Sequence, residues 1–69
     1  MDYYIARDND GSLFIYSEIP TLIDGHYDIN HECLDSPINL PMHFFENIKP
    51  LEMKKLVIEN GKWIIVNTW

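Results

Sequence analysis

The dipeptide Asn60-Gly61 is the feature that most constrains how this 69-residue chain can fold. Apolar residues flank it on both sides, and Asn and Gly both accept the positive φ that the two-residue type I′ turn of a β-hairpin requires. The sequence therefore predicts an antiparallel hairpin over residues 51–69. With that turn, the expected cross-strand pairs are Glu59 with Lys62, Ile58 with Trp63, Val57 with Ile64, and Leu56 with Ile65.

A second hairpin is predicted over residues 2–18. Its two arms are rich in aromatic and β-branched residues, which suit a half-buried pleated surface. The turn Asp8-Asn9-Asp10-Gly11 between them combines side chains that favour turns with a glycine that accepts positive φ. A three-residue loop places Arg7 opposite Leu13, Ile5 opposite Ile15, and Tyr4 opposite Tyr16, whereas a two-residue Asp10-Gly11 turn shifts that register.

The segment between the hairpins, residues 19–50, has no helical period, and Pro20 ends the first hairpin. Residues 26–29 alternate and are compatible with a short strand, but we expect mostly an ordered loop. Its packing residues would be Leu22, Ile23, Tyr27, Ile29, Leu34 and Ile38. After Pro41, residues 42–47 are typical of one turn of helix that stops before Pro50.

These elements predict a single domain over residues 1–69 that is mainly β. We expect a small four-stranded antiparallel sheet made of the two β-hairpins, with a long central loop over 19–50 and a one-turn helix near 42–47. A domain of this length buries only roughly 60% of its unfolded-chain surface, so the core must be thin.

The charge of the chain is uneven. The net charge is −6, and residues 1–47 carry nine carboxylates against Arg7 alone, a net charge of −8. The phosphate backbone repels such a surface, so direct nucleic-acid binding is not expected. The simplest role of the acidic residues is to keep a small apolar protein in solution.

Cellular location follows from the cysteine count and from the lack of long apolar runs. Cys33 is the single cysteine, which excludes an intrachain disulfide and suits a reducing compartment. The sequence has no secretory leader pattern, and no apolar run approaches the roughly 18 residues of a membrane span. We therefore expect a cytoplasmic protein with no membrane partner.

No residue cluster predicts catalysis or a cofactor. His26, His31, Cys33 and His43 are zinc-ligand types, but their spacing matches no standard zinc motif. The acidic neighbours of Cys33 would disfavour a reactive thiolate. Turn chemistry explains residues 8–12 better than a calcium loop does, because the ligand positions of an EF-hand are not filled. The sequence therefore predicts that the chain is not an enzyme.

The sequence of the first hairpin resembles that of a group of other proteins. The pattern Tyr3-Tyr4-Ile5-Ala6-Arg7-Asp8-x-Asp10-Gly11-x-Leu13-x-Ile15-Tyr16 resembles the opening of a group of short uncharacterised proteins from gut bacteria and their phages. Leu40-Pro41 followed by Phe44-Phe45, and residues 54–58, resemble their second half. The resemblance implies a phage, prophage or other accessory origin, and it brings no activity, cofactor or site residue.

The sequence favours a protein-interaction module that binds a protein partner or self-associates. The second hairpin is apolar on both faces near its turn, and Trp is a favoured interface anchor. The candidate interface residues are Trp63, Trp69, Ile64, Val66 and Val57. The alternative hypothesis is an acidic decoy that blocks a nucleic-acid-binding host defence protein, based on the −8 charge of residues 1–47.

Overall fold

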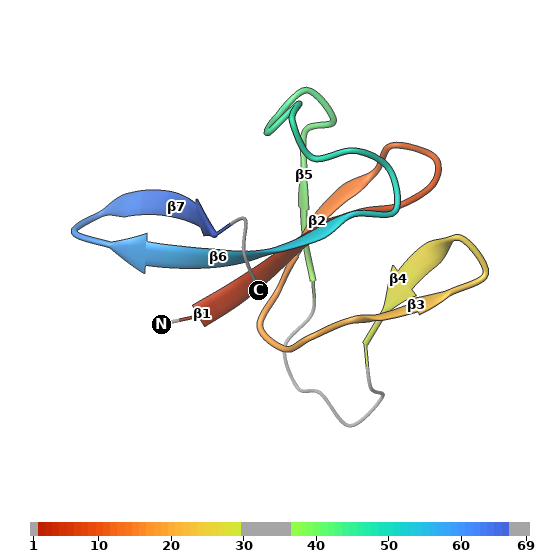
Figure 1. Ribbon diagram of the computed structural model, residues 1–69, viewed down its shortest axis with the longest axis horizontal. Helices are drawn as coiled ribbons and strands as arrows, with labels where there is room; N and C mark the ends of the chain where they lie inside the picture. The colour runs from red at the N-terminus through yellow and green to blue at the C-terminus, as the bar shows by residue number, and fades with distance from the viewer. Residues whose placement is uncertain (1, 30–36, 67–69) are drawn as a thin grey trace.

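The computed structural model describes residues 2–29 and 37–66, where the regular secondary structure is entirely β (Figure 1). Five strands form an antiparallel sheet in the order β5-β2-β1-β6-β7, and β3 pairs with β4 in a separate two-stranded sheet. The strands are β1 (Asp2–Arg7), β2 (Leu13–Tyr16), β3 (Thr21–Ile23), β4 (His26–Asp28), β5 (Ile38–Leu40), β6 (Met53–Glu59) and β7 (Lys62–Val66).

Both predicted hairpins are present. The β6–β7 hairpin has the predicted register, and the β1–β2 hairpin has the register of the three-residue loop, one of the two that the sequence left open. The β6–β7 hairpin pairs Glu59 with Lys62 and Val57 with Ile64, and its turn residues Asn60 and Gly61 both have positive φ, at 52° and 74°. In the β1–β2 hairpin, Arg7 pairs with Leu13, Ile5 with Ile15, and Tyr4 with Tyr16. The Asp8 N–H donates to the Ser12 carbonyl at 2.8 Å, which closes the three-residue loop.

The prediction of a four-stranded sheet was wrong by one strand, because β5 adds a fifth strand against β2. The segment predicted to be a long central loop also contains the β3–β4 hairpin. Its strand β4 is the short strand with which the alternating residues 26–29 were compatible. Leu22 and Ile23, expected to pack that segment, are exposed instead. A two-stranded sheet has few neighbours to bury its side chains.

The one-turn helix near 42–47 was also wrong. These residues form successive tight turns, in which the Phe44 N–H donates to Pro41 O at 3.0 Å and the Ile48 N–H donates to Phe45 O at 2.9 Å. Phe45 has a φ of 48°, which no right-handed helix contains. The carbonyls of Met42, Phe44 and Phe45 accept hydrogen bonds from the Arg7 side chain, so tertiary contacts replace the helical ladder.

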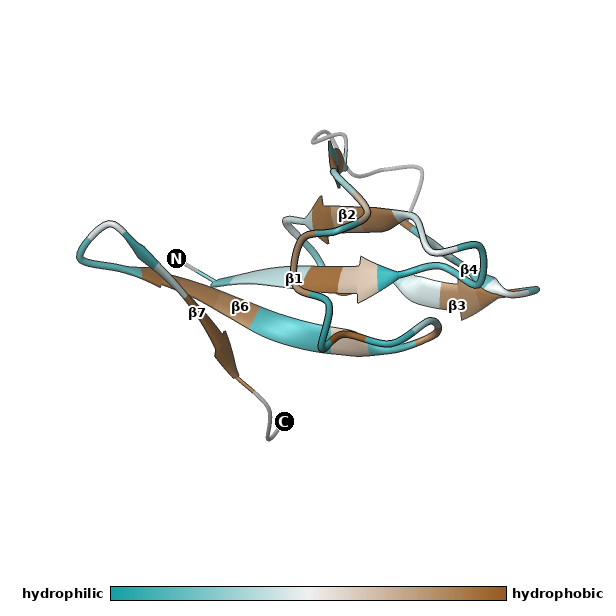
Figure 2. Cartoon of the chain, turned by 90° about the horizontal axis from the view of Figure 1, so that it is seen from above, coloured by the Kyte–Doolittle hydropathy of each residue, from teal (hydrophilic) through white to brown (hydrophobic). Residues whose placement is uncertain are grey.

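The hydrophobic core lies on one face of the five-stranded sheet, which we call the Ile5 face. It consists of Ile5, Leu13, Ile15 and Leu56, and the buried Ile48 side chain packs on it from the segment 41–52. The opposite face, here the Ala6 face, carries the buried Ala6 and Tyr16. The small β3–β4 sheet contacts β1 through β4, at the end of the molecule away from the β6–β7 turn (Figures 1 and 2).

A membrane-spanning helix does not occur in residues 2–29 or 37–66, since no helix there has the length and hydropathy to cross a bilayer.

Candidate protein-interaction surface

Arg7 organises the segment that frames the candidate surface. It is buried, and its guanidinium donates to five backbone carbonyls rather than to a carboxylate. The donor–acceptor distances are 2.6 Å to Ile48 O, 2.7 Å to Gly11 O, 3.0 Å to Met42 O, 2.8 Å to Phe44 O and 3.2 Å to Phe45 O. Carbonyl dipoles therefore compensate a charge that burial would otherwise strongly penalise.

The backbone of Arg7 holds the same segment from its other end. Its N–H donates to Glu52 O at 3.1 Å, and its carbonyl accepts from the Leu51 N–H at 2.8 Å. Side chain and backbone together fix residues 41–52 across one end of the Ile5 face. Because this segment is held by one residue of a central strand, its side chains have defined positions over the sheet.

The hydrogen bonds from Arg7 to residues 42–48 place the Phe45 side chain beside β7. Its ring stacks on Trp63 of β7, with ring centroids 6.3 Å apart and planes 9° apart. A parallel, offset pair of this kind is a favourable aromatic geometry. The stack orients the Trp63 indole, yet 47% of Trp63 remains exposed.

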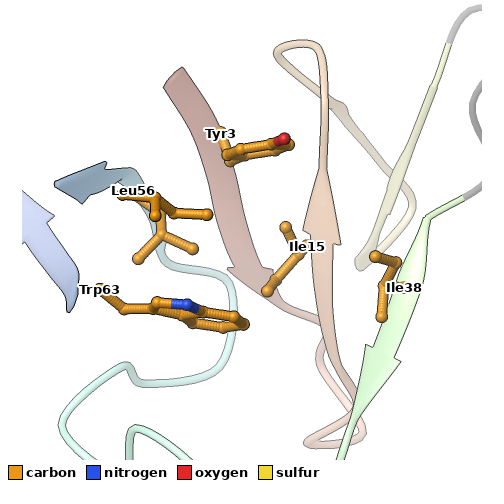
Figure 3. Close-up of a pocket in the computed structure, with 6 residues that line it drawn as sticks. Tyr3, Ile15, Ile38, Leu56 and Trp63 are labelled. Atoms are coloured by element: carbon orange, nitrogen blue, oxygen red, sulfur yellow. The ribbon is translucent and has the colours of Figure 1, made fainter. Parts of the chain in front are cut away.

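A groove of about 150 Å³ opens on the Ile5 face beside Trp63 (Figure 3). The side chains around it come from all five strands of the sheet, and the lining of the groove is almost entirely apolar. Of these, Ile38, Ile58 and Trp63 are exposed, whereas Ile15 and Leu56 are buried and form its floor. The lining residues are Tyr3, Ile15, Ile38, Leu56, Ile58 and Trp63.

The structure divides the predicted interface residues between the two faces. Trp63 pairs with Ile58 and lies on the Ile5 face, beside the groove. Ile64 pairs with Val57 on the Ala6 face, and Val66 lies on the same face opposite Lys55. Ile64 is exposed, whereas Val57 and Val66 are half-buried. Trp69 falls outside the described residues.

Sequence reasoning missed two parts of this surface. Tyr3 was not predicted to belong to the interface, and Ile38 was expected to pack the central loop, because neither shares a local pattern with Trp63. The pairings of β1 with both β2 and β6, and of β2 with β5, bring them to one groove. The alternation of side chains along the five strands places Tyr3, Ile38 and Trp63 on one face only once the strand order is known.

The β1–β2 turn and the β3–β4 hairpin meet at the other end of the molecule, through one backbone hydrogen bond and one to the Asp8 carboxylate. The Asn9 N–H donates to Gly25 O at 3.0 Å, and the Tyr27 N–H donates to Asp8 Oδ1 at 2.9 Å. Asp10 Oδ1 accepts from the Ser12 N–H at 2.9 Å, and this bond lowers the pKa of Asp10. The carboxylates that superficially resemble a calcium loop thus serve the turn and the contact between the sheets.

Tyr16 lies beneath this acidic end. Burial raises its pKa to about 12, and the negative charges of Asp8 and Asp28 add to the shift. Its hydroxyl donates to Tyr27 O at the long distance of 3.5 Å. Burial, followed by the charges of Asp8 and Glu52, also raises the pKa of Tyr27, whose hydroxyl donates to Leu51 O at 2.8 Å. Neutral phenols at these positions are therefore part of the folded state.

Two of the histidines considered as metal ligands lie in described parts of the chain. His26 is on β4, and His43 packs edge-on against Phe44 with centroids 5.0 Å apart. His31 and Cys33 fall outside the described residues. Within 2–29 and 37–66, no group of three or more His, Cys, Asp or Glu side chains is placed to hold a metal ion.

Comparison of the chain with protein-family models, with curated proteins and with solved structures found no match.

Proposed function

We propose that this protein is a non-enzymatic protein-interaction module that self-associates through its β6–β7 hairpin. The observation that carries the proposal is the exposure of Trp63, held by its stack on Phe45 beside an apolar groove. A large aromatic side chain that is oriented before binding contributes area at little further entropy cost.

The thin core supports the same proposal. The buried cluster consists of five residues, and ten large hydrophobic side chains within the described ranges are exposed. Burying even part of this apolar area against another chain would stabilise the folded state, because a partner that binds only the folded form shifts the unfolding equilibrium.

The proposal is tested by measuring molar mass over a wide concentration range, by light scattering and by sedimentation. The wild-type mass should rise with concentration from that of one chain toward that of two. Trp63→Ser should lower the association, while Leu22→Ser should leave it unchanged. Leu22 is a matched control because it is 48% exposed, close to the 47% of Trp63, but lies on β3 in the separate sheet. A wild-type mass that stays at one chain at every concentration would contradict self-association.

The acidic decoy is the alternative function, and it has a different signature. Binding of a basic target by the acidic half of the chain should weaken steeply as salt increases, because that attraction is screened. Association through Trp63 and its apolar neighbours should change little, or strengthen, under the same conditions. A salt series on the wild-type protein therefore separates the two functions.

A further inference from the structure

We propose that β7 pairs edge to edge with β7 of a second copy, antiparallel and about a two-fold axis at Ile64. This inference rests on the self-association proposed above and specifies its contact. The result would be one continuous sheet of ten strands across two chains.

The two edges of the five-stranded sheet are built differently. At one edge, β5 has three residues and is bracketed by Pro37 and Pro41, which lack an N–H and so discourage further pairing. At the other edge, β7 has five residues, Lys-Trp-Ile-Ile-Val, with no proline and a single charge at its start. Natural edge strands normally carry such protection, so an unprotected apolar edge indicates a partner strand.

The backbone of β7 presents hydrogen-bonding groups at defined positions. Because a two-residue turn makes Glu59 and Lys62 a hydrogen-bonded pair, the antiparallel ladder alternates from there along β7. The N–H and C=O of Lys62, Ile64 and Val66 therefore point toward β6, and those of Trp63 and Ile65 point away from it. These outward groups are the ones a further strand would bond.

One two-fold register uses all five residues of β7. With the axis at Ile64, Trp63 of each copy faces Ile65 of the other, and both residues belong to the outward-pointing set. Each of these two facing pairs exchanges both of its N–H···O bonds, as hydrogen-bonded antiparallel pairs do. Ile64 then faces Ile64 of the second copy as a non-hydrogen-bonded pair, with Cα atoms about 4.5 Å apart.

The side chains fit this register on both faces. On the Ala6 face, the two Ile64 side chains would meet with Val57 of each chain behind them, which gives an uninterrupted aliphatic row. On the Ile5 face, the exposed Trp63 would gain Ile65 of the second copy as a neighbour. Lys62 would face Val66, so the single charge of the strand is not opposed by its own copy, as it would be in a parallel arrangement.

The distribution of charge favours a second copy at this edge. Residues 48–69 carry four lysines against two glutamates, whereas residues 1–47 carry the net charge of −8. The turns that bear Asp8, Asp10 and Asp24 lie at the end of the molecule opposite the β6–β7 turn (Figure 1). Pairing through β7 therefore joins the two chains by their less acidic parts, and Figure 2 shows β7 as hydrophobic along most of its length.

The register is tested by disulfide trapping in a Cys33→Ser background. Ile64→Cys should form a disulfide-linked dimer on mild oxidation, because the expected Cα separation of about 4.5 Å lies within disulfide range. Ile38→Cys is the matched control: it replaces an exposed isoleucine on the opposite edge strand and should give no comparable dimer.

A second pair of variants tests the edge without a covalent bond. Ile64→Lys should remove the concentration-dependent rise in mass, while Leu22→Lys, at a similarly exposed position in the separate β3–β4 sheet, should retain it, with folding of both checked by circular dichroism. A wild-type dimer that Ile64→Cys fails to trap, and that Ile64→Lys leaves intact, would overturn the β7 pairing but not self-association. A wild-type chain that is monomeric throughout would overturn both.

Discussion

The Nε of Arg7 donates a 2.6 Å hydrogen bond to the carbonyl oxygen of Ile48, across 41 positions of the sequence. The same Ile48 places its buried side chain on the core of the Ile5 face. One residue of a central strand thus fixes both the backbone and the packing of the segment that covers the sheet. Through Phe45, the arrangement also sets the position of Trp63 beside the groove.

Arg7→Met should strongly destabilise the protein. It leaves five backbone carbonyls without their donor, and each buried acceptor left unsatisfied typically costs about 1–3 kcal/mol. A chain of this length has a total stability of roughly 3–10 kcal/mol, so most of it would be lost. Arg7→Lys should also destabilise, by about 1–3 kcal/mol, because an ammonium cannot reproduce the guanidinium fork and leaves some of the carbonyls unsatisfied. Urea unfolding followed by circular dichroism measures both.

Lys55→Met is the matched control for Arg7→Met, since it removes one positive charge as well. Lys55 forms a partly exposed ion pair with Asp2 at 3.2 Å, and such pairs contribute about 0–1 kcal/mol. If Arg7→Met and Lys55→Met lowered the unfolding free energy equally, net charge rather than the carbonyl contacts would be responsible.

The hairpins could be predicted from the sequence because their determinants are local. Asn60-Gly61 fixes a turn type, and a turn type fixes which residues of the two arms face each other. That is why the pairing of Val57 with Ile64 followed from residues close to one another in the chain. At Gly11 the sequence allowed a two-residue or a three-residue loop, and the pairing of Ile5 with Ile15 shows the three-residue loop.

The fifth strand, the turns over residues 42–48 and the burial of Arg7 could not be predicted, because they depend on contacts between distant segments of the chain. The fifth strand is three residues between two prolines, too short for alternation to identify it, and it exists through its pairing with β2. Residues 42–48 have a helix-like sequence, but they form turns instead, because the Arg7 side chain donates hydrogen bonds to three of their backbone carbonyls. Arg7 itself showed no sign of burial, since an arginine on a strand is ordinarily an exposed residue.

Gly11→Ala should destabilise more than Gly61→Ala. Both glycines have positive φ, at 94° and 74°, which costs an alanine about 1 kcal/mol. At Gly61 a Cβ would meet nothing within 4 Å, whereas at Gly11 it would lie 2.8 Å from Met42 Cε. Because the Met42 side chain is flexible and exposed, it can move aside at small cost, so thermal unfolding should show only a slightly larger loss for Gly11→Ala.

Adding Met42→Ala to Gly11→Ala isolates the contact. Compared with Met42→Ala alone, Gly11→Ala should then cost only as much as Gly61→Ala, because the backbone strain remains and the close approach is gone. An unchanged cost of Gly11→Ala in the Met42→Ala background would show that the side chain of Met42 yields freely.

Asp8→Ala should loosen the β3–β4 sheet from the main sheet. It removes the Oδ1 acceptor of the Tyr27 N–H, a contact of 2.9 Å, and the expected loss is about 1 kcal/mol. Hydrogen exchange should speed up at Tyr27 while the exchange of Ile5 and Leu56 amides changes little. Glu18→Ala removes an exposed carboxylate from the same half of the chain and should leave the Tyr27 amide unaffected. Equal acceleration at Tyr27 and Ile5 would instead mean that the two sheets open together.

Stability should fall between pH 10 and pH 12 through Tyr16. Its pKa is raised from 10.0 to about 12 in the folded protein by burial and by the charges of Asp8 and Asp28. A raised pKa means that the folded state holds the phenol proton more tightly than the unfolded state does. The contribution is therefore complete below pH 10 and is lost as pH rises toward 12. Tyr16→Phe should remove this part of the alkaline loss, measured by urea unfolding at several pH values.

Asp8→Asn provides the electrostatic test of the same shift. The amide oxygen can still accept from the Tyr27 N–H, but the negative charge near Tyr16 is gone, so the pKa of Tyr16 should fall. Tyrosinate absorbance during an alkaline titration, taken as the difference between each protein and its Tyr16→Phe counterpart, isolates this phenol from Tyr27, whose pKa is also raised. If Asp8→Asn left the titration of Tyr16 in place, burial and the charge of Asp28 would account for its high pKa without Asp8.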